Sequence, residues 1–244
     1  MKTAVITGCN RGLGKNLMDR FASEGYNIIA IIRKEDEVFV EEKDRLSKAY
    51  GISIIPIQAN LEDLDSIKAA LNSISQMECP IDVLINNAAI NISKPAFYMA
   101  YQDIQKSFKI NYFAPFLLSR DIGAIMIRQG YGSIINITSV AGLGSEPGGA
   151  AYDTSKAALN SFTRSFAQEV AFFNVRVNAV ACSVLETDMF NSMKQDVQKK
   201  ILKRIAMKRP ATFDEITDTV LFLVSDKASY ITGQILRVDG GYSL

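Results

Sequence analysis

Residues 2–14, Lys-Thr-Ala-Val-Ile-Thr-Gly-Cys-Asn-Arg-Gly-Leu-Gly, contain the pattern that decides the fold. Residues 2–7, with Ala-Val-Ile at their centre, predict a short buried strand, and the residues after the last glycine predict a helix that ends near Glu24. Glycines at such a junction allow a tight turn, close approach of the backbone to a pyrophosphate, and phosphate binding at the helix N-terminus. The stretch therefore predicts a dinucleotide-binding turn, with a turn that binds no ligand as the alternative; its expected cofactor contacts are Gly8, Asn10, Arg11, Gly12, Leu13 and Gly14.

Apolar strands and helical patterns alternate along the rest of the chain. Further strands are expected at residues 26–32, 52–57, 81–85, 133–138, 175–181 and 234–238, and helical patterns at residues 35–49, 101–129, from 152 onward and at 213–225. This alternation is typical of α/β proteins, and no repeat or linker interrupts it. We therefore expect one α/β domain that spans residues 1–244.

Composition excludes several classes of function. A net charge of +1 gives no electrostatic case for nucleic acid or an anionic membrane, and no apolar run approaches the ~20 residues of a membrane span, so we expect a cytoplasmic protein. Three cysteines without a Cys-x-x-Cys pair argue against a disulfide framework or a thiolate zinc site. The chain has no histidine, which excludes Ser-His-Asp and Cys-His systems and His-ligated metals. We expect no metal site, and catalysis must use Tyr, Lys, Ser, Asp or Glu.

Three candidate catalytic side chains lie within residues 139–156. Ser139 follows the apolar strand 133–138, so it lies at the carboxyl end of a strand, where open α/β sheets bind ligands. Tyr152 and Lys156 are four residues apart in a helical pattern and therefore share a face. A lysine cation beside a tyrosine would lower the pKa of the phenol and make it a general acid or base near neutral pH. The alternative is an exposed Tyr and Lys on a surface helix.

The end of the second strand indicates which nucleotide is bound. A NAD-binding unit places an acid there to hold the ribose hydroxyls, but this position is Ile32. Arg33 follows it, and Arg11 lies in the glycine turn, so two guanidinium groups could hold a 2′-phosphate bidentately. The sequence thus predicts NADP(H) rather than NAD(H); the alternative is two ordinary surface arginines.

Other strand ends supply further candidate cofactor contacts. Asn60 and Leu61 end the third strand, and Asn87 and Ala88 follow the fourth in a run of small residues that would let the backbone lie close to a ribose. A tight turn at a strand end would look the same.

The helical patterns contain two further features. In residues 101–129, Pro115 deprives the Asn111 carbonyl of its usual helical partner, which predicts a kink and makes Asn111 a candidate to hold a relay water. The alternative is a purely structural kink. Residues 188–209 form a basic amphipathic stretch that we interpret as a mobile lid over the substrate site, with a solvated helix as the alternative.

With these residues in place, the chain resembles the short-chain dehydrogenase/reductase family over its whole length. Thr7-Gly-x-x-x-Gly12-x-Gly14 looks like the cofactor turn of the family, and Asn86-Asn87-Ala88 like its ribose-side motif. The resemblance implies a Rossmann-type doubly wound parallel sheet with helices on both faces, and hydride transfer between a nicotinamide and a carbonyl or alcohol. It also implies a catalytic tetrad with one role for each residue: Tyr152 donates the proton, Lys156 lowers the Tyr152 pKa, Ser139 binds the substrate oxygen, and Asn111 holds the relay water. It further implies that Tyr152 and Lys156 contact the cofactor, as do Leu185 and Thr187 beside the nicotinamide carboxamide.

Within the family, residues 228–241 look most like 3-oxoacyl-carrier-protein reductases, which implies an acyl thioester substrate and a homotetramer or homodimer. The chain departs from the family pattern at Cys182-Ser183, where Pro-Gly is usual, at Ala89, and at Asn60, where an acid is usual. Only the basic run 199–209 offers a docking patch for an acidic carrier. We therefore keep as alternatives a reductase of another small ketone or sugar intermediate and a catalytically silent NADP(H)-binding sensor. A methyltransferase with a similar turn would have no use for Tyr152 and Lys156.

Overall fold

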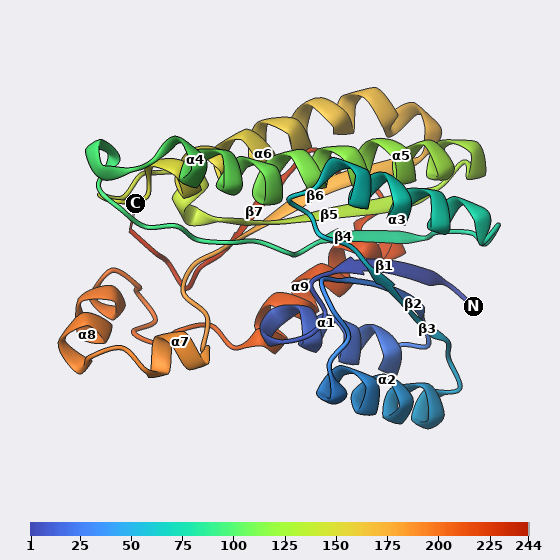
Figure 1. Ribbon diagram of the computed structural model, residues 1–244, viewed down its shortest axis with the longest axis horizontal. Helices are drawn as coiled ribbons and strands as arrows, with labels where there is room; N and C mark the ends of the chain where they lie inside the picture. The colour runs from blue at the N-terminus through green and yellow to red at the C-terminus, as the bar shows by residue number, and fades with distance from the viewer. Residues whose placement is uncertain (244) are drawn as a thin grey trace.

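One parallel sheet forms the centre of the protein (Figure 1). The computed structural model describes residues 1–243, without the side chains of residues 188 and 189. The strands are arranged in the order β3-β2-β1-β4-β5-β6-β7, and every neighbouring pair is parallel. Their bounds are β1 Thr3–Thr7, β2 Asn27–Ile32, β3 Ile54–Gln58, β4 Val83–Asn86, β5 Gly132–Ser139, β6 Val175–Cys182 and β7 Ile235–Val238.

Helices cover both faces of the sheet, as the resemblance implied. One layer holds α1 (Gly12–Ser23), α2 (Glu37–Tyr50) and α9 (Phe213–Val224), and the other holds α3 (Leu64–Gln76), α4 (Tyr101–Phe108), α5 (Ala114–Gln129) and α6 (Ala150–Val170) (Figure 1). Ile28 and Ala30 of β2 pack in the first layer, whereas Ile29 and Ile31 pack in the second. A strand buried on both faces must be apolar at every position, which explains its continuous hydrophobic run.

The strand order creates the crevice in which the site lies. From β1 the chain builds outward through β2 and β3 on one side, and then returns to place β4 on the other. The loops after β1 and β4 therefore diverge to opposite faces and leave an opening at the carboxyl ends of the strands.

The predicted helix over residues 101–129 is not continuous. A π-helical segment at Lys109–Phe113 separates α4 from α5, and the Ala114 N–H donates to the Lys109 carbonyl. Pro115, the second residue of α5, has no N–H to donate to the preceding turn, so a regular α-helix cannot run through this point. The expected kink is confirmed, and its form is a π-bulge.

Two other boundaries differ from those expected. Helix α6 starts at Ala150, two residues before Tyr152, and β6 extends through Cys182, which pairs with Ser139 on one side and Val238 on the other. Residues 188–209 contain two short helices, α7 (Asp188–Asn191) and α8 (Gln195–Lys203), which lie beyond the carboxyl ends of the strands (Figure 1). Among the described helices, none is both long enough and apolar enough to cross a membrane.

Candidate active site

The glycine turn between β1 and α1 has no room for side chains at two positions. Gly8 has a φ of +79°, a conformation that favours glycine, and a Cβ there would lie 3.2 Å from the Ala88 Cα. A Cβ on Gly14 would lie 1.9 Å from the Gly8 carbonyl oxygen. The predicted close approach of strand, turn and helix is therefore present, and the N-terminus of α1 opens toward the crevice.

Hydrogen bonds join the ends of β1 and β4. The Thr7 hydroxyl accepts from the backbone N–H groups of Asn87 and Ala88, both at 2.9 Å. The Asn87 side-chain amide donates back to the Thr7 carbonyl at 2.9 Å. This reciprocal pairing fixes the loop that was predicted to lie against the adenosine ribose.

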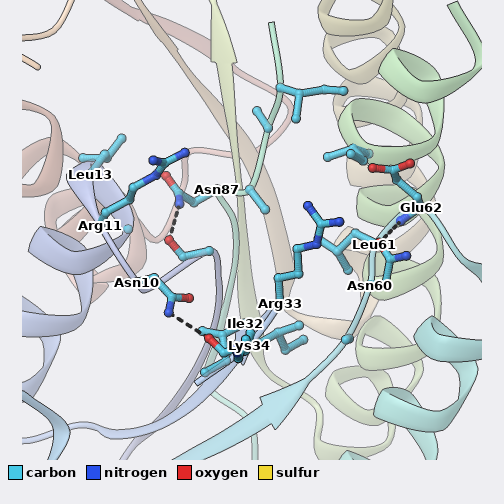
Figure 2. Close-up of a pocket in the computed structure, with 18 of the residues that line it drawn as sticks. Asn10, Arg11, Leu13, Ile32, Arg33, Lys34, Asn60, Leu61, Glu62 and Asn87 are labelled. Atoms are coloured by element: carbon cyan, nitrogen blue, oxygen red, sulfur yellow. Dashed lines mark hydrogen bonds between the residues drawn. The ribbon is translucent and has the colours of Figure 1, made fainter. Parts of the chain in front are cut away.

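A cavity of about 550 Å³ extends from this turn across the carboxyl ends of β2 and β3 (Figure 2). Arg33 projects into it between Asn10 and Leu61, and Arg11 extends from the glycine turn above Asn87. Neither arginine makes an ion pair with another described residue, so both guanidinium groups keep their donors available for an anionic ligand. Of the predicted cofactor residues, Gly8, Asn10, Arg11, Leu13, Gly14, Arg33, Asn60, Leu61, Asn87 and Ala88 line this cavity.

Two of the predicted contacts also use their side chains within the protein. The Asn10 amide donates to the Lys34 carbonyl at 3.0 Å and to the Asp36 carboxylate at 3.1 Å, which ties the glycine turn to the loop after β2. The Asn60 side-chain oxygen accepts from the Glu62 N–H at 3.2 Å (Figure 2). Gly12 does not line the cavity; with a φ of +56°, it forms the first residue of α1.

A second cavity, of about 250 Å³, brings the catalytic candidates together. Ser139, Tyr152 and Lys156 all line it. It shares the lining residues Leu13, Asn87 and Ala89 with the first cavity, so the two cavities adjoin along the strand ends. Leu185 and Thr187 also line it, as predicted.

Tyr152 and Lys156 share a face of α6. The Lys156 Nζ lies 5.9 Å from the centroid of the Tyr152 ring and donates a hydrogen bond to the Ile137 carbonyl at 2.8 Å. Lys156 is only 2 % exposed to solvent, and Tyr152 is partly buried. The reading of these residues as exposed surface side chains is therefore wrong.

The structure does not show the expected lowering of the Tyr152 pKa by Lys156. Burial raises the pKa of Tyr152 to about 12, and the Ser139 hydroxyl only partly opposes this change. Burial also lowers the pKa of Lys156 to about 8. The physical reason is that the Lys156 ammonium points at the Ile137 carbonyl rather than at the phenol oxygen. The loss of solvent around the phenol therefore has the larger effect on the Tyr152 pKa. At neutral pH the phenol holds its proton, which suits a general acid.

Ser139 is prepared to donate a hydrogen bond into the cavity. Its Oγ accepts from the Ala141 N–H at 3.1 Å and caps a short 3₁₀ turn after β5. Because this contact uses one of the hydroxyl lone pairs, the hydroxyl proton remains free to point at an oxygen in the cavity.

Asn111 lies behind the cavity rather than in its wall. It is completely buried, and its side-chain oxygen accepts from the Ile90 N–H at 2.9 Å. Its amide donates to the Ile90 carbonyl at 2.9 Å and to the Ser155 hydroxyl at 3.0 Å. The side chain thus connects the loop after β4 to α6. The Ser155 hydroxyl in turn donates a hydrogen bond to the Tyr152 carbonyl at 2.7 Å.

Comparison with known proteins agrees with this geometry. A family model described as enoyl-(acyl carrier protein) reductase matches residues 8–243. A 3-oxoacyl-[acyl-carrier-protein] reductase of Aquifex aeolicus is 35% identical over 240 residues, covering 98% of this chain and 96% of the relative. The chain belongs to the short-chain dehydrogenase/reductase family. This dehydrogenase/reductase is therefore an oxidoreductase, and the predicted family is confirmed.

Solved structures also resemble this dehydrogenase/reductase. One is titled a putative NAD(P) dependent gluconate 5-dehydrogenase from Beutenbergia cavernae with bound NADP; its TM-score is 0.91 at 32% identity, covering 98% of this chain and 96% of that one. Another is titled 4-hydroxyisoleucine dehydrogenase complexed with NADH, with a TM-score of 0.92 at 27% identity, covering 100% and 99% of the two chains.

Sequence reasoning missed residues that organise the site of this dehydrogenase/reductase without being its reactive groups. Thr7 and Ser155 each join two elements through hydroxyl hydrogen bonds, and both are buried. A polar residue at an otherwise apolar buried position was the available signal for both. Glu62 and Lys106, an ion pair at 3.1 Å in the wall of the larger cavity, gave no such signal because charged residues are common on helix surfaces.

The end of β6 and the loop after it carry Cys182 and Ser183 where the family usually has Pro-Gly. Cys182 lines the catalytic cavity, and burial raises the pKa of its thiol to about 12, which favours the unreactive thiol form. Ser183 donates to the Asp239 carbonyl at 3.2 Å.

Over the part of the chain that the structure describes, no group of three or more potential metal-ligating residues is found.

Proposed function

We propose that this protein is an NADP(H)-dependent reductase that converts the ketone of a 3-oxoacyl thioester to a secondary alcohol. One observation carries the proposal: Ser139, Tyr152 and Lys156 line a cavity that adjoins the cavity beside the glycine turn. The names of the curated relatives support the substrate class, and the two unpaired arginines support the 2′-phosphate nucleotide.

The larger cavity fits a dinucleotide, because a glycine turn at a helix N-terminus, free guanidinium groups and a loop of small residues line it. A bound nicotinamide cofactor would supply the hydride. In this proposal the turn holds the pyrophosphate, Arg11 and Arg33 hold the 2′-phosphate, and Asn87 and Ala88 face the adenosine ribose. Asn60 and Leu61 lie beside the adenine, and Tyr152, Lys156, Leu185 and Thr187 hold the nicotinamide half.

The chain's own residues then complete the reduction. Ser139 donates a hydrogen bond to the carbonyl oxygen, where negative charge develops. Tyr152, neutral at pH 7, transfers its proton to that oxygen. Lys156 carries a positive charge below pH 8 and stabilises the phenolate that remains. The Asn111 side chain is committed to Ile90 and Ser155, so in this account its main-chain carbonyl, which Pro115 has no N–H to satisfy, holds the water from which the proton is replaced.

A second substrate class has a specific observation in its favour. The structural neighbour from Beutenbergia cavernae is titled a gluconate 5-dehydrogenase, which supports a sugar-acid ketone as the alternative substrate. A silent NADP(H)-binding sensor is the third reading, since Cys182-Ser183 replaces the usual Pro-Gly of the family beside the cavity.

We further propose a cytoplasmic homotetramer or homodimer. The three free cysteines support a reducing compartment. Two groups of large aromatic side chains are exposed, one at the start of α4 and one after α6. Because exposed apolar patches often mark protein contacts, these side chains support an assembly; they are Phe97, Tyr98, Tyr101, Phe172 and Phe173.

A substrate panel tests the proposed function. Binding of NADPH and NADH is measured first, and oxidation of NADPH is then followed with an acetoacetyl thioester, free and on an acyl carrier protein, and with a keto-gluconate. We expect the thioesters to be the better substrates and NADPH the better cofactor. Preference for the keto-gluconate would favour the sugar-acid reading, and nucleotide binding without turnover of any ketone would favour the sensor.

A further inference from the structure

The Glu146 carboxylate contacts two segments that are far from it in the sequence. It forms an ion pair with the Arg204 guanidinium and accepts a hydrogen bond from the Tyr242 hydroxyl at 3.3 Å. The guanidinium also lies over the Tyr242 ring, 4.7 Å from its centroid. These three side chains form a closed cluster, which we call the Glu146 latch.

Backbone contacts bring the two partners of Glu146 together. The Ser243 N–H donates to the Arg204 carbonyl at 2.8 Å, and the Arg204 side chain donates to the Ser243 carbonyl at 3.0 Å. Ile205 and Tyr242 form an antiparallel bridge. The C-terminal segment 239–243 is therefore hydrogen-bonded to the end of α8, and both lie at the left of Figure 1.

Each segment that the latch joins is attached to a residue that lines the catalytic cavity. The loop 140–149 connects Ser139 to α6, and within it the Glu146 N–H donates to the Asp153 carboxylate at 2.9 Å, next to Tyr152. The C-terminal segment starts at Asp239, whose carbonyl accepts from Ser183 in the cavity wall. Helix α8 follows Thr187, which lines the same cavity.

Neither cavity has a residue of these segments in its described lining, but the four residues to which the segments are attached, Ser139, Tyr152, Ser183 and Thr187, line the catalytic cavity and not the cavity beside the glycine turn. The latch thus connects elements around the catalytic cavity. Because the proposed contacts to the pyrophosphate, the 2′-phosphate and the adenine all lie beside the glycine turn, NADPH affinity depends chiefly on residues that the latch does not touch, and loss of the latch should change substrate binding instead.

We propose that Glu146 is a positioning residue for the carbonyl substrate. By holding α8 and the C-terminal segment against the loop 140–149, it fixes the walls between which the substrate binds beside Tyr152. The inference rests on the proposed function in one respect: the substrate enters on the Ser139 and Tyr152 side of the nucleotide.

The size of the effect follows from the exposure of the cluster. The side chains of Arg204 and Glu146 are 37% and 38% exposed, so water screens their attraction. Loss of the cluster should therefore have a modest effect, an increase in KM of about 3- to 10-fold, which corresponds to about 0.7–1.4 kcal/mol.

Charge reversal tests the latch. We would compare Glu146→Arg, Arg204→Glu and the double variant Glu146→Arg/Arg204→Glu, with Lys48→Glu as a matched control. Lys48 is exposed on α2, lies outside the described lining of both cavities and makes no ion pair with another described residue. KM is measured with the best small ketone or carrier-free thioester, and the Kd of NADPH is measured separately by fluorescence.

Each single variant should raise KM about 3- to 10-fold with an unchanged NADPH Kd, the double variant should restore most of the loss, and Lys48→Glu should have no effect. Single variants that leave KM unchanged, a double variant that restores nothing, or a parallel change in NADPH Kd would each overturn the proposal.

A second measurement separates this inference from the proposed function. An endoprotease specific for lysine cleaves after Lys199 and Lys200 of α8 when that segment detaches. If the latch holds α8, cleavage is faster in both single variants and returns toward the unaltered rate in the double variant, whether or not a ketone substrate is known. Equal cleavage rates in all the proteins would overturn the latch, whereas a failure to reduce any ketone with the cleavage pattern intact would count against the proposed function alone.

Discussion

Lys156 is a charged group kept in a place where charge is unfavourable. Burial lowers its pKa from 10.5 to about 8, and its ammonium contacts the Ile137 carbonyl rather than a carboxylate. In the unfolded chain the lysine binds its proton up to a higher pH than in the folded protein. The unfavourable contribution of the Lys156 charge to the free energy of unfolding is therefore fully present below about pH 8, and it disappears as the pH rises toward 10.5.

Replacement of Lys156 by Met should stabilise the protein at pH 7 by roughly 2 kcal/mol, the burial penalty of about 3 kcal/mol less the lost hydrogen bond. This advantage should vanish near pH 10, where the lysine is largely neutral. Urea unfolding at both pH values measures it, with the exposed Lys48→Met as the control. A stability difference that is the same at pH 7 and pH 10 would show that burial does not perturb Lys156 as described.

Arg33 should control the choice of nucleotide. Charge-assisted bidentate contacts contribute about 1.5–3 kcal/mol, so Arg33→Asp should reduce the preference for NADPH over NADH by about 10- to 150-fold. The ratio of the two Kd values measures this directly. Lys48→Asp makes the same change of charge on α2, outside the lining of the cavity, and should leave the ratio unaltered. An unchanged ratio in Arg33→Asp would refute the assignment.

The proximity of the candidate catalytic residues was accessible from the sequence, but their pKa values were not. Spacing by four residues was enough to place Tyr152 and Lys156 on one face of a helix. The direction in which the lysine Nζ points depends on β5, which supplies the Ile137 carbonyl from 19 residues away. No local pattern contains that information.

At the scale of elements, the π-helical segment serves the site by placing Asn111. The side chain satisfies both backbone groups of Ile90 and reaches Ser155, so the segment links the loop after β4 to the first turns of α6. The sequence predicted a kink from Pro115, but it did not predict this three-way contact, because Ile90 and Ser155 are 21 and 44 residues away.

Asn111→Ala should destabilise the protein by about 2–4 kcal/mol, because it leaves both backbone groups of the half-buried Ile90 without their partners. Ser155→Ala removes the partner of only one Asn111 hydrogen bond and should cost about 1–2 kcal/mol. Denaturant unfolding of the two variants gives the comparison. If Asn111→Ala costs no more than Ser155→Ala, the side chain does not hold the loop in the way that its contacts indicate.

At the scale of the whole molecule, the fold was the most predictable property. A glycine turn after the first strand and an unbroken alternation of strands and helices were sufficient for the doubly wound sheet, which is confirmed. The extent of the domain, residues 1–244, and the assembly of the chain stay predictions. The joining of residues 204–207 to the C-terminal segment was not predictable, because no sequence pattern specifies which loops meet beyond the ends of a sheet.

We propose that the two sides of the site have separate tasks: the glycine-turn side binds the nucleotide, and Tyr152 supplies the proton to a ketone beside it. Tyr152→Phe removes only the phenol oxygen and keeps the ring against Lys156. The most direct test is a paired measurement of NADPH Kd and single-turnover NADPH oxidation with the best ketone, in the unaltered protein and in Tyr152→Phe. The account predicts an unchanged Kd within about twofold and a rate lower by at least about 100-fold; a variant that retains its rate would contradict it.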